Sequence, residues 1–250
     1  MNNSLIMRKF GKSMDTYDDN AYAQKEIAAK LAGLISDLYP DIPKTIMEIG
    51  CGTGLLTKNI LSVFPDAYYY LNDINDKAGL RIQSLFSGNR HTFISGDARL
   101  IDFPDGIDLM ISSSTIQWFE NLSVFIEKAH RSLSPQAYMF LSTFGENNLK
   151  EIREITGTGL KYPSPDCLRR LFSSGFEVLH LSEEEMRVPF NSPAEILSHF
   201  RSTGVNANCS GAVRTKSGLK SFCNKYDKMF SNGTEVILTY NPVFLGLKKK

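Results

Sequence analysis

Three glycines at alternating positions, Gly50, Gly52 and Gly54, follow an apolar run and constrain this chain more than any other feature. Residues 45–49 have the apolar composition of a buried strand, and the apolar spacing over 55–61 is helical. Glycines in the turn between them allow positive φ and let a ligand approach the main chain closely. The stretch predicts a strand, a tight turn and a helix. Such a turn either begins a nucleotide site or is simply a tight corner.

The chemistry of the loop favours a nucleoside ligand without phosphates. Glu48 places a carboxylate two residues before the first glycine. The dinucleotide fingerprint needs a glycine where Leu55 stands, and it holds a pyrophosphate at the N-terminus of the next helix. S-adenosyl-L-methionine (SAM) has no phosphate, and its ribose and adenine suit carboxylates and a close backbone. We therefore expect SAM rather than NAD here, with Cys51 present for its small side chain.

Composition argues against several other classes of protein. The 250 residues suit one α/β domain, and the net charge of +1 gives no general attraction to nucleic acid. The four cysteines lie far apart in the sequence, so we expect neither a metal site nor a disulfide framework. We see no leader peptide and no run of about 18 apolar residues that would span a membrane. We expect a cytoplasmic protein, a monomer, with no membrane or nucleic-acid partner.

Apolar, β-rich segments alternate with amphipathic segments along the chain. This alternation predicts an α/β fold, a doubly wound, mostly parallel seven-stranded sheet forming a single domain over 1–250. Two parts fall outside the alternation: an N-terminal helical cap over 1–40, and a helical insertion over 191–230, between strands six and seven, which we expect to cover the ligand crevice. The predicted strands are 45–50, 67–71, 91–95, 107–112, 137–143, one beginning near Phe176, and 235–247. The further predicted helices are 21–39, 75–87, 121–133, 164–174, 193–202 and 216–229.

Acidic residues stand at the ends of the first three predicted strands: Glu48, Asp73 and Asp97. Because the carboxyl ends of parallel strands share one edge of a sheet, we expect these side chains to lie close together. Asp73 suits the ribose hydroxyls, and Asp97 with the Ala98 amide suits adenine. A single aspartate at a strand end is usually a turn or capping residue, but three in succession indicate a nucleoside site. The remaining cofactor-binding candidates are Gly50, Cys51, Gly52, Gly54, Ile74 and Ser112.

These motifs together resemble the class I SAM-dependent methyltransferases, over residues 45–145. Shorter motifs spread over nearly the whole chain resemble a narrower family, the malonyl-acyl-carrier-protein O-methyltransferases of biotin synthesis (BioC). Two departures from the BioC pattern are Ser113, where asparagine is usual, and 208–220, which does not align. The segments that carry the narrower resemblance are 112–119, 140–145, 148–152 and 199–207, with Phe10, Tyr17 and Gln24 near the N-terminus.

The resemblance implies methyl transfer from SAM to the free carboxylate of a malonyl group on an acyl carrier protein, with S-adenosyl-L-homocysteine as coproduct. That carboxylate is ionised at neutral pH, so we expect positioning residues and no acid–base catalyst. Tyr17, Gln117 and Trp118 are the positioning candidates. Tyr22 and Arg201 are the substrate-binding candidates, Arg201 because a guanidinium can hold a carboxylate with two hydrogen bonds. Because a carrier protein is acidic, we expect a basic docking patch that includes Arg169, Arg170, Arg214 and Lys216.

Two alternatives stay open on the sequence alone. The chain could methylate another small molecule, such as a free carboxylic acid or a quinone precursor, or it could bind SAM without turnover. Methylation of a nucleic-acid base is disfavoured, because strand four ends in Ser-Ser-Ser-Thr over 112–115 instead of Asn-Pro-Pro-aromatic.

Overall fold

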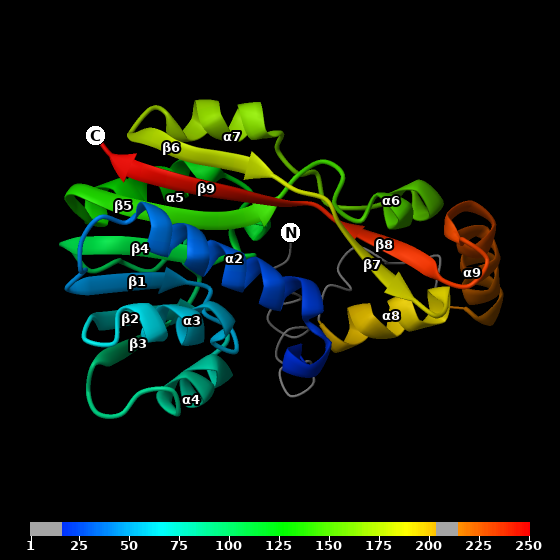
Figure 1. Ribbon diagram of the computed structural model, residues 1–250, viewed down its shortest axis with the longest axis horizontal. Coiled ribbons are helices and arrows are strands. Elements are labelled where there is room, and N and C mark those ends of the chain that lie inside the picture. The colour runs from blue at the N-terminus through cyan, green and yellow to red at the C-terminus, as the bar shows by residue number, and fades with distance from the viewer. Residues whose placement is uncertain (1–16, 204–214) are drawn as a thin grey trace.

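The computed structural model describes residues 17–203 and 215–250 (Figure 1). A seven-stranded sheet has the order β3-β2-β1-β4-β5-β9-β6. Neighbouring strands from β3 to β5 are parallel, and β9 is antiparallel to both β5 and β6. The predicted doubly wound, mostly parallel sheet is therefore confirmed. Its strands are β1 (Thr45–Ile49), β2 (Tyr68–Asp73), β3 (His91–Ser95), β4 (Ile107–Ser113), β5 (Leu133–Phe144), β6 (Phe176–Glu183) and β9 (Pro242–Lys249).

Helices cover both faces of this sheet, because successive strand residues point to opposite sides. Ile46 of β1 packs into the core beneath the first set of helices, whereas its neighbour Met47 packs into the core beneath the second. The first set is α2 (Tyr22–Leu38), α3 (Leu55–Val63) and α4 (Lys77–Gln83), and the second is α5 (Leu122–Ser132) and α7 (Pro165–Phe172). A 3₁₀ turn, η1 (Ile116–Trp118), follows β4.

The last part of the chain differs from the prediction. The single strand expected over 235–247 is two strands, β8 (Val236–Tyr240) and β9, separated by Asn241. β8 pairs antiparallel with an unpredicted strand, β7 (Met186–Phe190), in a second sheet. The helix α6 (Lys150–Thr156) was also not predicted. Apolar residues run almost unbroken through 236–247, so the pattern did not reveal that the chain changes sheets at Asn241.

The second sheet forms part of an accessory unit, which consists of β7, α8 (Pro193–Ser202), α9 (Lys216–Phe230) and β8. Figure 1 shows this unit beyond the carboxyl ends of the parallel strands, with α8 running back toward the start of α2. The two helices expected in the insertion are thus confirmed. Each begins at a side-chain cap: Ser192 accepts a hydrogen bond from the Glu195 amide, and Thr215 accepts one from the Gly218 amide.

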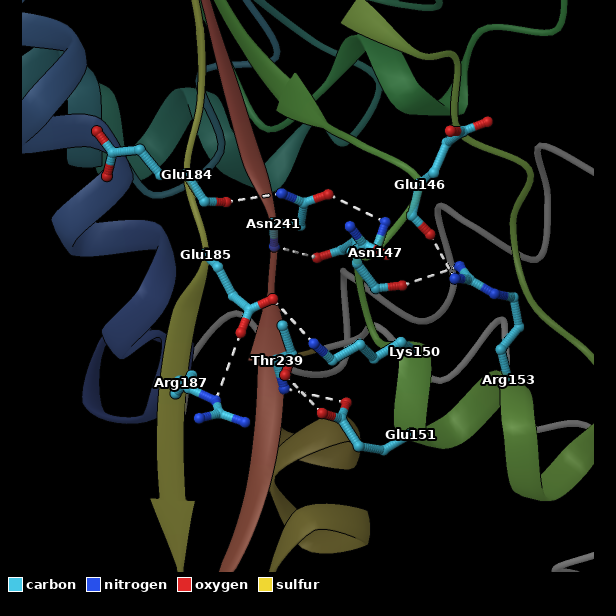
Figure 2. Close-up of polar contacts among 11 residues, drawn as sticks. Glu146, Asn147, Lys150, Glu151, Arg153, Glu184, Glu185, Arg187, Thr239 and Asn241 are labelled. Atoms are coloured by element: carbon cyan, nitrogen blue, oxygen red, sulfur yellow. Dashed lines mark hydrogen bonds and ion pairs between the residues drawn. The ribbon is translucent and has the colours of Figure 1, made fainter. Parts of the chain in front are cut away.

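A buried polar junction joins the accessory unit to the main sheet (Figure 2). Asn241 uses all of its backbone and side-chain polar groups there. Its side-chain amide donates to the Glu184 carbonyl at 2.7 Å and accepts from the Asn147 amide at 3.0 Å. Its backbone amide donates to Asn148 Oδ1, and its carbonyl accepts from the Gly145 amide. Because an unsatisfied buried polar group is expensive, this pairing allows the chain to leave one sheet and enter the other.

Glu151 of α6 makes a second link in the same junction. Its carboxylate is buried and accepts hydrogen bonds from the backbone amide and the hydroxyl of Thr239 on β8. The neighbouring Lys150 forms an exposed ion pair with Glu185, 2.8 Å between Nζ and Oε2. Figure 2 shows both side chains reaching from α6 toward the two crossing strands.

Candidate active site

A cleft opens at the carboxyl edge of β1, β2, β3 and β4, beside the start of α2 and the turn η1. This is the edge at which open α/β sheets bind ligands. Carboxylates from three strands meet there, as the sequence predicted. The predicted site residues that line the cleft are Tyr17, Glu48, Gly50, Cys51, Gly52, Asp73, Ile74, Asp97, Ala98 and Trp118.

The glycine loop needs its glycines for different reasons. Gly50 has a φ of 70°, and a Cβ added there would lie 2.2 Å from the Thr115 hydroxyl oxygen. Gly52 has a φ of 53°, but a Cβ there would meet no atom within 4 Å, because the position faces the open cleft. Gly50 therefore allows the loops after β1 and β4 to touch, whereas Gly52 leaves room for a ligand.

Asp73 holds the loop in place from the end of β2. Its Oδ2 accepts a hydrogen bond from the Gly52 amide at 2.9 Å, and its Oδ1 accepts one from the Asn75 amide at 2.8 Å. Burial raises the pKa of Asp73, and these amide donors oppose the increase. The Asp73 carboxylate is therefore held next to the glycine loop, where a bound nucleoside would contact both of them.

Glu48 is 1% exposed and lies behind the glycine loop, at the cleft wall. Its Oε2 accepts a hydrogen bond of 2.6 Å from the Thr57 hydroxyl on α3. Burial raises its pKa to about 8, with a further contribution from the charge of Asp73 and opposition from the Thr57 hydrogen bond. The same burial raises the pKa of Cys51, so this thiol is not an activated nucleophile.

Asp97 is paired within the protein. Arg99 Nη2 lies 2.6 Å from Asp97 Oδ2, and the Arg99 backbone amide donates to Asp97 Oδ1 at 3.0 Å. Arg99 also lines the cleft. The ion pair fixes the Asp97 carboxylate at the end of β3 and leaves the guanidinium beside it as a second recognition group that sequence reasoning missed.

Several predicted site residues lie outside the lining of the cleft. The Ser112 hydroxyl donates to the Ile49 carbonyl at 2.8 Å, and a Cβ at Gly54 would press on Leu85, so both have packing roles. The Gln117 side-chain amide donates to the Ser114 carbonyl from η1. Tyr22 is 61% exposed. None of these four residues lines the cleft.

The predicted substrate and docking residues are spread more widely. Arg201 is exposed in the last turn of α8, and Lys216 is the first residue of α9. Arg169 and Arg170 are exposed in the last turn of α7, next to the start of β6. The carboxyl edge is at the other end of that strand, so the structure does not bring this pair to the cleft. Arg214 lies outside the described residues.

Unpartnered polar atoms gather at the cleft. Within 17–203 and 215–250, Gln24 Oε1, Thr53 Oγ1 and Ser114 Oγ are buried without a hydrogen-bond partner, and all three residues line the cleft. Buried polar atoms are normally satisfied, so this concentration indicates a polar ligand. Thr53 and Ser114 follow strands one and four closely and could have been found by the strand-end argument. Other lining residues that the prediction missed are Asn72, Asn75, Gly96, Thr115 and Phe119.

Comparison with known proteins identifies the class of enzyme that the sequence motifs resemble. The family model described as a methyltransferase domain matches residues 47–141. A protein of Bacillus halodurans assigned as a methyltransferase has a TM-score of 0.63 at 14% identity, covering 88% of this chain and 98% of its own. The N-methyltransferase NodS of Bradyrhizobium japonicum, solved with S-adenosyl-L-homocysteine, has a TM-score of 0.58 at 10% identity, covering 98% of both chains. Fold and cleft together define a class I SAM-dependent methyltransferase.

Two curated relatives narrow this assignment, both of them a malonyl-[acyl-carrier protein] O-methyltransferase. The protein of Bacteroides thetaiotaomicron is 35% identical over all of this chain and 99% of its own length. That of Bacteroides fragilis is 37% identical over 98% of this chain, which spans half of that longer protein. This chain belongs to the malonyl-[acyl-carrier protein] O-methyltransferase family, as its motifs predicted. SAM is accordingly its methyl donor.

No helix in 17–203 or 215–250 is long and apolar enough to cross a membrane. In the same part of the chain, no three His, Cys, Asp or Glu side chains are grouped as metal ligands would be.

Proposed function

We propose that this protein methylates the free carboxylate of a malonyl group carried by an acyl carrier protein, using SAM bound in the cleft. One observation carries the proposal: the carboxyl groups of Glu48, Asp73 and Asp97 meet the glycine loop in a single cleft lined with unpartnered polar atoms. The family relationship supports the acceptor. The same reaction places the protein in the pathway that builds the pimeloyl part of biotin, which agrees with the resemblance of its motifs.

In this proposal the two halves of the sheet edge hold different parts of the donor. Asp73 binds the ribose hydroxyls, since its carboxylate lies at the end of β2 beside the Gly52 amide. Asp97, Ala98 and Arg99 hold the adenine at the end of β3. The methionine portion then lies toward β1 and β4, because the sheet order is β3-β2-β1-β4.

Bound SAM supplies an activated methyl group with a neutral thioether as leaving group. A carboxylate oxygen of the acceptor forms the new C–O bond as the C–S bond breaks, and the sulfur keeps that electron pair. No proton moves in this step, because the acceptor is already ionised. The work left to the protein is orientation and exclusion of water, for which Tyr17 and Trp118 are placed in the lining and Gln117 beside it.

Acceptor recognition is assigned to the accessory unit. The last turn of α8 carries Arg201, which is exposed and close in sequence to His199, and the His199 ring bonds to the backbone of Asn20, just before α2. We assign Arg201 to the malonyl carboxylate, and Tyr22 stays a substrate-binding candidate. Arg201→Lys should then lose methyl transfer even at low salt, because a single ammonium cannot form the two-pronged contact.

The docking surface has two possible positions. Lys216 begins α9 on the accessory unit, whereas Arg169 and Arg170 of α7 lie next to the start of β6, at the edge of the sheet opposite the cleft. A carrier protein touching the second pair would have to reach along β6, about 26 Å for its eight residues. Comparison of Lys216→Glu with Arg169→Glu distinguishes the two positions. Only a charge reversal in the docking surface should raise the KM for the carrier substrate, and that increase should depend on salt.

The decisive test is product mass spectrometry after incubation with SAM and malonyl-acyl-carrier protein, malonyl-CoA or free malonate in parallel. We expect a methyl ester on the carrier-bound substrate well above the other two. Equal turnover of free malonate would instead identify a general small-acid methyltransferase, and binding without any S-adenosyl-L-homocysteine release would identify a non-catalytic SAM-binding protein.

The proposal includes a monomeric, cytoplasmic enzyme with no nucleic-acid or membrane partner. The net charge of +1 supports the absence of a nucleic-acid partner. Light scattering across a concentration series tests the monomer, and cell fractionation tests the location.

A further inference from the structure

Gln24 is a buried amide in the first turn of α2 with one unused hydrogen-bonding atom. The residue is 6% exposed and lines the cleft. Its Oε1 is buried and has no partner among the described residues. A buried carbonyl oxygen without a hydrogen bond destabilises the folded protein, so we expect a bound ligand to supply the missing donor.

A chain of hydrogen bonds fixes which end of the amide faces the cleft. The Gln24 side chain donates to the Tyr240 hydroxyl at the end of β8. Tyr240 Oη lies 2.6 Å from His199 Nε2, and the His199 ring also bonds to the Asn20 backbone. Because a backbone carbonyl can only accept, the other ring nitrogen carries the proton and Nε2 accepts from Tyr240. Tyr240 then accepts from Gln24 Nε2, which leaves Oε1 as the free end.

The position of Gln24 indicates which part of the donor it would meet. Asp73 and Asp97 stand on β2 and β3, the side assigned to the nucleoside. Helix α2 packs instead against α3, β4, β5 and β9, on the side of the cleft left for the methionine portion. That portion has an ammonium group, a carboxylate and a sulfonium. Only the ammonium can donate a hydrogen bond.

We propose that Gln24 Oε1 accepts a hydrogen bond from the α-ammonium group of SAM, and that Tyr240 and His199 of the accessory unit hold Gln24 in the orientation this contact requires. Gln24 is then a donor-binding residue, and Tyr240 and His199 are positioning residues. The inference rests on the proposed donor site. It links α8, which carries the acceptor candidate Arg201, to the occupancy of that site.

The test compares S-adenosyl-L-homocysteine with its analogue lacking the amino group, by calorimetry on the full chain. Wild type should bind the amino-containing ligand about ten- to a hundredfold more tightly, the range for a hydrogen bond to a charged group. Gln24→Leu should bind both ligands with equal affinity, close to that of wild type for the analogue. Tyr240→Phe keeps Gln24 but removes the hydroxyl that holds its side-chain amide. The preference for the amino-containing ligand should then become smaller without disappearing.

The remaining outcomes of this experiment would overturn either the inference about Gln24 or the proposed donor site. A preference that survives Gln24→Leu, or a loss that is equal for both ligands, overturns the inference. If Gln24→Leu does not fold, Gln24→Glu still presents an acceptor oxygen and should keep the preference, and its loss there also overturns the inference. Equal binding of both ligands to wild type defeats this inference alone, whereas no binding of either ligand defeats the proposed donor site. A changed KM for malonyl-acyl-carrier protein with unchanged donor affinities would reassign Gln24 to the acceptor.

Discussion

Glu48 and Thr57 share a buried hydrogen bond, 2.6 Å between Oε2 and Oγ1, which joins the end of β1 to the first turn of α3 behind the glycine loop. Burial dominates the electrostatics of this pair and raises the pKa of Glu48 to about 8. The carboxyl group is therefore mostly protonated at neutral pH when the cleft holds no ligand. A cationic donor nearby would favour the ionised form.

The first prediction concerns stability. The pKa of Glu48 rises from 4.5 to about 8 on folding, so the folded state binds more protons than the unfolded state between these values. The free energy of unfolding should therefore fall as pH rises through this window, by at most about 1.4 kcal/mol per pH unit. The free energy of unfolding can be measured by urea titrations at several pH values. Its decrease with rising pH should be smaller for Glu48→Gln than for wild type. Identical slopes for wild type and variant would contradict the assigned pKa.

The second prediction separates donor binding from chemistry. Donor binding at pH 7 should release protons as Glu48 ionises, seen as a calorimetric enthalpy that differs between two buffers of unequal ionisation enthalpy, and Glu48→Gln should abolish the difference. Under single-turnover conditions with saturating SAM, the rate of methyl transfer should be flat from about pH 6 to 8, since the acceptor is already ionised. A steep limb near pH 7 would point to a base not identified in the cleft.

The third prediction uses the glycine loop. Gly50→Ala carries the same left-handed backbone cost as Gly52→Ala and also forces a Cβ against Thr115, which adds about 1–3 kcal/mol of destabilisation. Gly52→Ala has open space, so its destabilisation should be limited to about 1–2 kcal/mol for the left-handed backbone. Its effect should fall instead on SAM affinity, because the new methyl group enters the cleft. Thermal unfolding and calorimetry on both variants should show these opposite profiles, and the reverse order would refute the two assigned roles.

The fourth prediction concerns Asp73. Removal of its carboxylate in Asp73→Ala should weaken SAM binding about ten- to a hundredfold, through loss of a charge-assisted hydrogen bond and of the tether to the Gly52 amide. Calorimetry with SAM and NAD on wild type and variant provides the measurement. Detectable NAD binding without SAM binding in the wild type would exclude the donor assignment altogether.

The fifth prediction tests the junction of Figure 2. Glu151→Ala leaves the buried Thr239 amide and hydroxyl without their acceptor and should cost about 1–3 kcal/mol of folding free energy. The adjacent Lys150→Ala removes only an exposed ion pair and should change stability by about 0–1 kcal/mol. Affinity for S-adenosyl-L-homocysteine should be unchanged in both variants, since neither residue lines the cleft. Equal destabilisation by the two variants would argue against the buried contact.

Short-range patterns were sufficient for most of the fold and half of the site. Strands β1 to β5 each carry a run of apolar residues that ends in a polar turn, so both their positions and the meeting of Glu48, Asp73 and Asp97 could be predicted from parallel-sheet geometry. Gly54 and Ser112 belong to the same motifs but pack away from the cleft. A motif identifies neighbours in sequence, and only the packing decides which of them face the ligand.

The remaining features depend on contacts between distant segments. The break at Asn241 is stabilised by partners near residues 145–148 and 184, about which a local apolar pattern carries no information. Gln24 reads as an ordinary polar residue of an amphipathic helix, yet Tyr240, more than two hundred residues away, fixes its orientation. Arg169 and Arg170 were nominated by charge alone, and charge does not tell which end of a strand a helix reaches.

The crossing at Asn241 has a topological consequence. Glu183 and Val243 are paired neighbours in β6 and β9, so the whole of 184–241 leaves and returns to the main sheet at one place. A short turn joining these two residues would convert β6 and β9 into an ordinary hairpin, with every strand of the main sheet still in its register. The accessory unit is thus grafted onto the tip of a hairpin. Such an architecture lets a lineage exchange what it methylates while the machinery that holds the methyl donor is inherited nearly intact, with the contacts that Gln24 and Glu151 make to β8 among the connections that a new graft would have to rebuild.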